Sequence, residues 1–356
     1  MKTIKKYLST RKINGNTSLL FVLIILSFFL YSASLQSNEP FSPVNPNASP
    51  EARLLLRFLY QIQGKYILAG QHNYPCTLSE FTEKAKTISG RYPALWGQDF
   101  GFTLDDKDGI VCRQAVIDEA VRQHSNGVII TLMWHAVRPV DDEPNGWEES
   151  VQAELSNTQW DSLVTRGTAL NKRWLVQLDT IACYLGQLRD ARVPVLWRPY
   201  HEMNGQWFWW GQKKGPNGYI LLWKMLQKYL IETHGLNNLL WVWNPNSSSD
   251  GTDSLYHYFP GINYVDVLAM DIYRHNFEIP YYEELCDLAG NKPVAIGECA
   301  QMPSPEILIE EPRFTWFMVW SEFIEKSNTQ QHIKHVFDSE RVITLDKLNN
   351  LRFYEN

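Results

Sequence analysis

The sequence lacks the short patterns that mark several classes of enzyme and binding protein. Neither a G-x-G-x-x-G nor a G-x-x-x-x-G-K-[S/T] phosphate loop occurs in its 356 residues, which argues against a nucleotide-binding sheet. No C-x-x-C pair is present, and Gly205 stands where a zinc helix opened by His201 and Glu202 would need a second histidine. We therefore expect neither a metal nor an organic cofactor.

Basic residues are also scarce. Lysine and arginine number 33 against 39 acidic residues, which gives a formal charge of -6, and no long basic run follows the first dozen residues. Proteins that bind nucleic acid normally carry a basic surface, so this class of partner is not expected. A neutral or polar substrate fits the charge balance better.

The first 34 residues have the layout of an export signal peptide. Lysines and arginines precede an apolar run at 19–31, and small residues follow it at 32–34. Because this run is shorter than the roughly 20 residues that span a bilayer, cleavage near Ser34 is favoured over an uncleaved anchor, and no stable membrane insertion is expected. Residues 35–50 are predicted to form a flexible leader before a catalytic domain at 51–356. The exported chain would reside in a periplasm, at a cell surface or outside the cell.

Eight short apolar or β-branched runs alternate with stretches of helical spacing along the rest of the chain. This alternation predicts an α/β fold, a single-domain (β/α)8 TIM barrel that we expect to be a monomer, with an open doubly wound sheet as the alternative. The segment 134–171 is too long for a simple connection, so it is predicted to be an elaborated loop over the active face. The predicted strands are 66–69, 93–96, 128–133, 193–197, 239–243, 265–270, 294–296 and 315–320.

Polar residues follow these predicted strands, where barrel enzymes carry their active sites. Two of them are glutamates, Glu202 and Glu298, and glycoside hydrolysis needs two carboxyl groups: one protonates the leaving oxygen, and the other attacks the sugar or activates water. The structural alternatives are that Glu202 pairs with Arg198 and that Glu298 caps a helix. The polar strand-end residues are Gln71, His72, Gln98, Asp99, His135, Arg198, His201, Glu202, Asn244, Asp271, Tyr273 and Glu298, joined by the aromatic residues Trp134 and Trp320.

Four aromatic residues in succession, 207–210, suggest a surface for sugar rings. Aromatic faces stack on the C–H faces of a pyranose, and alternation along the chain predicts that two of the four fill the core, with Trp207 in contact with substrate. Cys76 and Cys112 both fall in loops above the first two predicted strands, so a disulfide between them stays open. Cys299 is expected to be a small buried residue rather than a nucleophile.

The segment Arg198-Pro-Tyr-His-Glu-Met-Asn-Gly, followed by Trp207-Phe-Trp-Trp-Gly, resembles the acid/base signature of glycoside hydrolase family 26, the β-mannanases. Shorter motifs resemble the family in the same order along the chain. They are Gly70-Gln-His72, Trp134-His135, Trp243-Asn-Pro245, Asp271-Ile-Tyr273 and Ile296-Gly-Glu298.

This resemblance implies a retaining double displacement, in which Glu202 is the acid/base and Glu298 the nucleophile. It also implies that Tyr273 hydrogen-bonds the nucleophile and that Trp320 forms the floor of the glycone subsite, with Trp316 as the competitor for that role. The predicted substrate-binding residues are His135, His201, Trp207, Tyr273, Trp320 and Arg198.

Together these features predict an exported endo-β-1,4-mannanase that acts on mannan, glucomannan or galactomannan. Two alternatives lie within the family: an exo-acting enzyme that releases mannobiose, and a hydrolase of β-glucan or β-1,3-xylan. A further alternative is a carbohydrate-binding barrel without catalytic activity.

Overall fold

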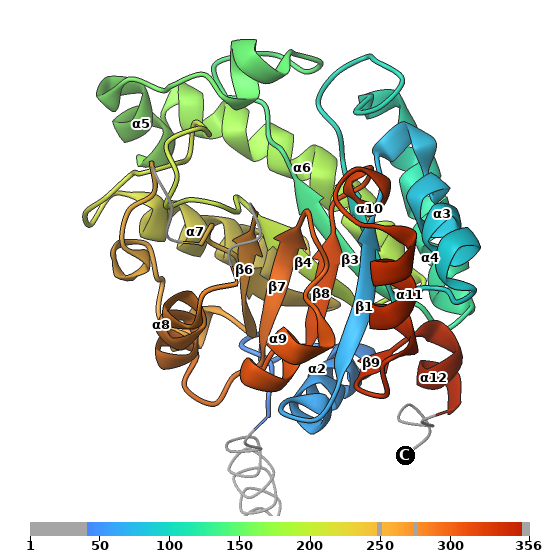
Figure 1. Ribbon diagram of the computed structural model, residues 1–356. Helices are drawn as coiled ribbons and strands as arrows, with labels where there is room; N and C mark the ends of the chain where they lie inside the picture. Colours follow the sequence, from blue (N-terminus) through green and yellow to red (C-terminus); the bar gives the residue numbers. More distant parts are fainter. Residues whose placement is uncertain (1–40, 248–250, 274–276, 351–356) are drawn as a thin grey trace, which may run out of the picture. The chain divides into compact units, whose positions relative to one another are not determined.

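The computed structural model describes residues 41–247, 251–273 and 277–350, and its centre is a closed barrel of parallel strands (Figure 1). Neighbouring strands pair in the order β2-β3-β4-β5-β6-β7-β8-β1, and a pairing between β1 and β2 closes the circle. The predicted (β/α)8 barrel is therefore confirmed. The strands are β1 (Ile67–His72), β2 (Leu95–Asp99), β3 (Ile129–Trp134), β4 (Val195–Pro199), β5 (Leu239–Trp243), β6 (Val267–Ile272), β7 (Val294–Cys299) and β8 (Trp316–Val319).

Helices surround the barrel (Figure 1). The connection from β5 to β6 is the exception. The helices in its described residues, 244–247 and 251–266, are the single-turn 3₁₀ helices η5 (Leu255–His257) and η6 (Ile262–Tyr264). The prediction of an α-helix after β5 is therefore wrong for this part of the chain. The α-helices are α2 (Pro50–Ile62), α3 (Glu80–Ser89), α4 (Arg113–Ser125), α5 (Asn157–Val164), α6 (Ala169–Asp190), α7 (Tyr219–Lys228), α8 (Ile279–Ala289), α9 (Pro305–Glu310), α10 (Phe323–Lys326), α11 (Gln330–Asp338) and α12 (Leu345–Asn350).

The barrel interior is apolar toward the beginnings of the strands. Alternate residues of a strand face opposite sides, so Leu196 points inward while its neighbours Val195 and Trp197 pack outward against the helices. Helix α2 adds Leu55 and Leu59 to the inward-facing residues and covers this end of the barrel (Figure 1). We call these side chains the inner apolar cluster. Its strand members include Leu68, Leu95, Ile129, Leu196, Leu240, Val267, Ala295 and Trp316.

The strands differ from their predicted bounds mainly at their C-terminal ends. His72, Asp99 and Glu298 belong to β1, β2 and β7 themselves and do not merely follow them, because backbone pairing continues past the apolar run. A short ninth strand, β9 (Val342–Ile343), pairs with the start of β1. Two residues are too few for a recognisable alternation, so this strand could not be predicted from the sequence.

The compact unit begins before residue 51. Its first residues were predicted to belong to a flexible leader, but the backbone N–H of Val44 donates to Asp266 Oδ1 at 2.7 Å, and Asn45 and Ala48 are buried. This corrects the domain boundary to about Pro43. The predicted signal peptide at 1–34 lies outside the described residues. Among the helices of the described chain, none has the length and apolar character that a membrane crossing requires.

Candidate active site

Glu202 lies in a tight turn directly after β4. Pro199 ends the strand, as predicted, and Tyr200 and Glu202 then adopt left-handed backbone conformations, with φ of 48° and 53°. Such conformations are uncommon for residues other than glycine and persist where surrounding contacts hold them. Here the backbone N–H of Glu202 donates to the carbonyl of Asn244 at 2.7 Å. The turn therefore fixes the Glu202 side chain at the mouth of the barrel.

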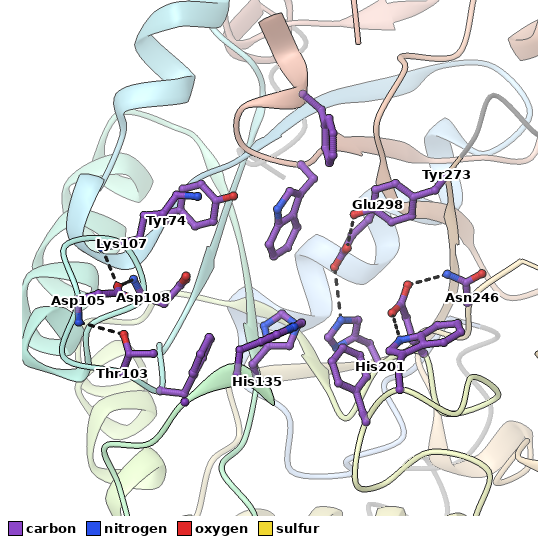
Figure 2. Close-up of a pocket in the computed structure, with 18 of the residues that line it drawn as sticks. Tyr74, Thr103, Asp105, Lys107, Asp108, His135, His201, Asn246, Tyr273 and Glu298 are labelled. Atoms are coloured by element: carbon purple, nitrogen blue, oxygen red, sulfur yellow. Dashed lines mark hydrogen bonds and ion pairs between the residues drawn. The ribbon is translucent and has the colours of Figure 1, made fainter. Parts of the chain in front are cut away.

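The Glu202 carboxyl group is buried, and both of its oxygens accept hydrogen bonds. Trp207 Nε1 donates to Oε2 and Asn246 Nδ2 donates to Oε1, each at 2.6 Å (Figure 2). Burial, followed by the nearby charge of Glu298, raises the pKa of Glu202 to about 7 despite these two bonds. A carboxyl group of this kind holds its proton near neutral pH and can donate it.

The Glu298 carboxylate is held by a guanidinium group and a phenol. Arg198 Nη2 donates to Oε1 at 2.7 Å. The Tyr273 hydroxyl donates to Oε2 at 2.8 Å (Figure 2). Burial and the charge of Glu298 raise the pKa of Tyr273 well above its ordinary value, so the phenol remains a donor. His201 Nε2 lies 3.7 Å from Oε1. A charged donor and a neutral donor at hydrogen-bond distance suit a carboxylate that acts in its ionised form.

A β-bulge in β7 turns Glu298 toward the barrel interior. Met270 of β6 pairs with Ile296, but the next residue of β6 pairs with Glu298, which leaves Gly297 as an extra residue. Ile296 packs outward against the helices, and in a regular strand Glu298 would share that face. A Cβ atom at position 297 would lie 1.8 Å from Asn244 Oδ1. The bulge and the missing side chain together give Glu298 its place beside the other polar residues.

Arg198 lies beneath the two glutamates and not on the cavity wall. It is 1% exposed, and its Nε donates to Asn244 Oδ1 while its Nη1 donates to the Gly297 carbonyl, both at 2.9 Å. The ion pair considered from the sequence exists, but with Glu298 in place of Glu202. This corrects the prediction that Arg198 contacts substrate, because its donors hold the site in place and none of its atoms reaches the cavity surface.

Two buried histidines line the cavity between the acids and the opposite wall. His135 Nδ1 lies 2.9 Å from Asp99 Oδ2, and the His135 ring meets the His201 ring edge-on at a centroid distance of 4.7 Å. Burial opposes protonation of His135, but the charge and hydrogen bond of Asp99 outweigh it and raise the pKa. Burial, with His135 and Arg198 adding repulsion, brings the pKa of His201 well below its ordinary value. His201 is therefore a neutral group beside Glu298.

The aromatic run after Glu202 divides between cavity and core. Trp207 and Phe208 line the cavity, whereas Trp209 and Trp210 are buried and donate through Nε1 to the carbonyls of Ala136 and His201. Two of the four rings thus fill the core, as predicted. The pair in the cavity is adjacent and not alternating, because the run forms a turn and not a strand.

Trp320, at the end of β8, lines the cavity and stacks on the His72 ring at a centroid distance of 4.1 Å. Its competitor, Trp316, is fully buried in the inner apolar cluster and cannot reach a ligand. Between these two tryptophans, the structure therefore assigns the cavity position to Trp320. His72 itself is buried and packs beneath the Trp320 ring, as expected of a structural residue.

The cavity that these residues enclose has a volume of about 760 Å³. Seven of the predicted site residues lie on it, and they come from five different strand ends. Sequence reasoning missed Asn246 and Trp147: the first stands two residues past the strand-end Asn244, and the second lies in the long segment after β3, which was expected to cover the active face. The seven predicted residues on the cavity are Glu202, Glu298, His135, His201, Trp207, Tyr273 and Trp320.

One group in the described chain brings potential metal-ligand atoms together. The ligand atoms of His201, Glu202 and Asp271 lie within 4.8 Å of one another. However, the Arg198 guanidinium already lies 3.5 Å from Asp271 Oδ1, and both Glu202 oxygens accept hydrogen bonds. A cation placed here would face an arginine, so the arrangement suits acid–base chemistry better than metal binding.

A disulfide joins Cys76 and Cys112, which settles the pairing left open by the sequence. It links η1 (Pro75–Thr77) to η2 (Ile110–Cys112), and the loop between residues 102 and 109, which contributes to the cavity wall, runs next to it. Cys299 is fully buried and belongs to the core, as expected.

Comparison with known proteins agrees with this geometry. A sequence model described as glycosyl hydrolase family 26 matches residues 44–347. The structure of GH26A from Muricauda sp. superimposes with a TM-score of 0.82 and 45% identity, and the match covers 85% of this chain and 99% of that one. A β-mannanase from a symbiotic protist of the termite Reticulitermes speratus, solved with a gluco-manno-oligosaccharide, gives a TM-score of 0.75 at 31% identity, covering 86% and 97%.

Curated relatives are similar over most of this chain. A mannan endo-1,4-beta-mannosidase of Thermothelomyces thermophilus is 33% identical over 315 residues, which cover 85% of this chain but only 62% of that protein. A mannan endo-1,4-beta-mannosidase of Bacillus subtilis is 31% identical over 343 residues, covering 86% of this chain and 90% of that protein. Because the family model matches residues 44–347 and these relatives are more than 30% identical over most of the chain, the chain belongs to glycosyl hydrolase family 26.

Proposed function

We propose that this protein is a retaining endo-β-1,4-mannanase, with Glu202 as acid/base and Glu298 as nucleophile. The observation that carries the proposal is the pair of unlike carboxyl groups on one cavity. Glu202 is buried with a pKa raised to about 7, whereas Glu298 is bonded to the guanidinium of Arg198 and the hydroxyl of Tyr273. Two carboxyls with opposite environments are what the two roles require.

In the first displacement, Glu202 donates its proton to the glycosidic oxygen while Glu298 attacks the anomeric carbon. The C–O bond to the leaving chain breaks, and an ester bond to Glu298 forms. Tyr273 and Arg198 orient the attacking carboxylate, and the negative charge that Glu298 loses on ester formation lowers the cost of ionising Glu202. The same residue that raised the pKa of Glu202 therefore lowers it again for the second step.

In the second displacement, ionised Glu202 takes a proton from water, and the resulting hydroxide oxygen attacks the anomeric carbon. The ester bond to Glu298 breaks and the sugar leaves with its original anomeric configuration. Trp207 Nε1 and Asn246 Nδ2 hold the Glu202 carboxylate in place in this ionised form. His135, His201 and Trp207 are positioned to contact the sugars on either side of the cleaved bond.

The mannan substrate and the endo mode are supported by the relatives. Proteins of Thermothelomyces thermophilus and Bacillus subtilis that are 33% and 31% identical carry the name mannan endo-1,4-beta-mannosidase. These names favour internal cleavage of mannan over the exo-acting alternative. We also propose export, since a disulfide such as Cys76–Cys112 persists in oxidising compartments and the first 34 residues have the pattern of a signal peptide.

The proposal is tested by incubating the full chain with galactomannan and following viscosity and reducing ends together. We expect viscosity to fall much faster than reducing ends appear, as internal cleavage requires. Glu298→Ala should lower the rate by roughly 10⁴-fold or more, the scale reached when a covalent nucleophile is removed. Equal rates for the two proteins would contradict the assignment of Glu298, and a slow fall in viscosity with steady release of mannobiose would contradict endo action.

A further inference from the structure

Helix α4 begins with a buried arginine. Arg113 is its first residue and is 3% exposed. The N-terminus of a helix carries a partial positive charge, which disfavours a cation there, and α4 has no acidic residue in its first turn to offset that charge. Burial adds the cost of removing the guanidinium group from water. A residue that breaks two such local rules is expected where it serves something other than the stability of its own helix.

The Arg113 guanidinium group joins the two segments that follow β2 and β3. Nε donates to the Phe100 carbonyl at 2.8 Å and Nη2 donates to the Gly101 carbonyl at 3.0 Å, both directly after β2. Nη1 donates to Glu143 Oε2 at 2.7 Å, in the long segment after β3. Because the guanidinium group is planar and its N–H groups point in fixed directions, these three bonds set the position of the two segments relative to each other.

Each of the two segments carries an aromatic ring of the cavity wall close to this junction. Phe102 and Trp147 both line the cavity, and their ring centroids lie 5.4 Å apart. The backbone N–H of Asn145 donates to the Phe102 carbonyl at 2.7 Å, which links the segments a second time. The Trp147 ring also meets the His135 ring edge-on at 5.0 Å. A shift of either segment would therefore displace several rings of the cavity wall together.

The ion pair of Arg113 and Glu143 is poorly suited to stabilise the fold by itself. The two side chains are 4% and 15% exposed, and the desolvation of buried charges offsets most of their attraction. Glu143 Oε1 is buried and accepts no hydrogen bond from the described residues. What the pair provides is a fixed geometry between two segments that lie beyond the paired strands.

We propose that Arg113 is a positioning residue of the active site, which holds the Phe102 and Trp147 rings in the cavity wall without touching substrate. For the identity of the ligand, this inference rests on the proposed function. Arg113 itself does not line the cavity, so its effect passes through the two segments that it joins. Affinity for the sugar chain therefore depends on the planar shape of the guanidinium group and not only on its charge.

The test measures calorimetric binding of mannotetraose to Glu298→Gln, whose carboxamide does not attack the sugar. Adding Arg113→Lys keeps the positive charge but removes the planar group, so we expect the affinity to fall roughly 10-fold or more. Arg122→Lys in the same background is the matched control and should leave the affinity unchanged. Arg122 belongs to the same helix and pairs with Glu119, but its side chain is 54% exposed. Equal affinities of the two double variants would refute the role of Arg113.

A second measurement needs no sugar and separates this inference from the proposed function. Hydrogen exchange of the full chain, read by mass spectrometry, reports on the backbone N–H of Asn145, which donates to the Phe102 carbonyl. In Arg113→Lys we expect this N–H to exchange roughly 10-fold faster or more, while those of α6 keep their rates. Such a change without mannotetraose binding to Glu298→Gln would support the positioning role and count against mannan as the ligand. Unchanged exchange at Asn145, or equal acceleration in α6, would overturn the inference.

Discussion

The two ends of the barrel interior bury very different side chains, although the same strands build both. At one end, Leu196 and Leu240 point inward and pack under α2. Two residues further along β4, Arg198 points inward, and its Nε donates at 2.9 Å to Oδ1 of Asn244, which directly follows β5. The apolar end gains free energy from burial alone, whereas each buried polar group at the other end needs a partner. The inner apolar cluster is therefore scaffold, and the polar end carries the chemistry.

The substitution with the largest expected effect removes an acid from the polar end of the barrel. Glu202→Ala removes the group that protonates the leaving oxygen, so kcat/KM for mannan should fall by roughly 10²- to 10⁴-fold. A nitrophenyl mannobioside should lose much less in its first step, because its leaving group needs little protonation. Equal losses for the two substrates would assign Glu202 a role other than proton donation.

A substitution in the bulge tests whether the orientation of Glu298 depends on Gly297. Gly297→Ala places a Cβ atom 1.8 Å from Asn244 Oδ1, which must move and disturb its bond to Arg198. We expect a loss of about 1–3 kcal/mol in unfolding free energy, measured by denaturant titration, and a fall of roughly 100-fold in kcat. Gly186→Ala is the control, since its nearest atom would be 3.7 Å away and a helical alanine should not harm the fold. Unchanged kcat in Gly297→Ala would show that the bulge tolerates a side chain.

The opposite result is expected at the apolar end. Leu240→Ala removes a fully buried side chain from the inner apolar cluster and should lower the free energy of unfolding by about 2–5 kcal/mol. At a temperature where the variant is folded, kcat and KM should stay near their original values. Urea unfolding and steady-state kinetics on the same preparation check both parts. A large drop in kcat would mean that the two ends of the barrel are mechanically coupled.

The smallest expected effect is the dependence on pH. Glu202 must be protonated to act as the acid, and its pKa is raised to about 7, so kcat/KM should fall about 10-fold per pH unit above that value. In Glu202→Ala assayed with the nitrophenyl substrate, this alkaline fall should disappear. If it persists, another group, such as His135 with its raised pKa, controls the fall.

Much of the fold could be predicted because its signal is local. All eight barrel strands appear where apolar runs alternate with helical spacing, and the polar residues after them converge at one end, since parallel strands all finish there. The errors lie where tertiary contacts decide. Arg198 was assigned to substrate contact, but its donors hold Glu298, Asn244 and the Gly297 carbonyl beneath the cavity.

Residues outside the strands were the hardest to predict. Trp147 and Asp108 reach the cavity from long loops, where no periodicity tells which side chain faces inward. Asn246 was missed because the residue that follows a strand most closely, Asn244, was taken as the polar group of β5. In the structure, Asn244 accepts a hydrogen bond from Arg198, and Asn246 donates one to Glu202.

The sequence by itself determined the barrel and singled out Glu202 and Glu298 as the candidate acids, because hydrophobic period and strand-end position are properties of short segments. It could not determine which way Glu298 faces. Simple alternation from Ile296 would send that side chain outward, and only the pairing of β6 with β7 reveals the extra residue at Gly297 that turns it inward. Likewise, the two carboxyl groups differ in environment because of their burial and their hydrogen-bond partners. Glu298 accepts from Arg198 and Tyr273, and Glu202 accepts from Asn246. These partners are distant in sequence, so only folding brings them to the carboxyl groups.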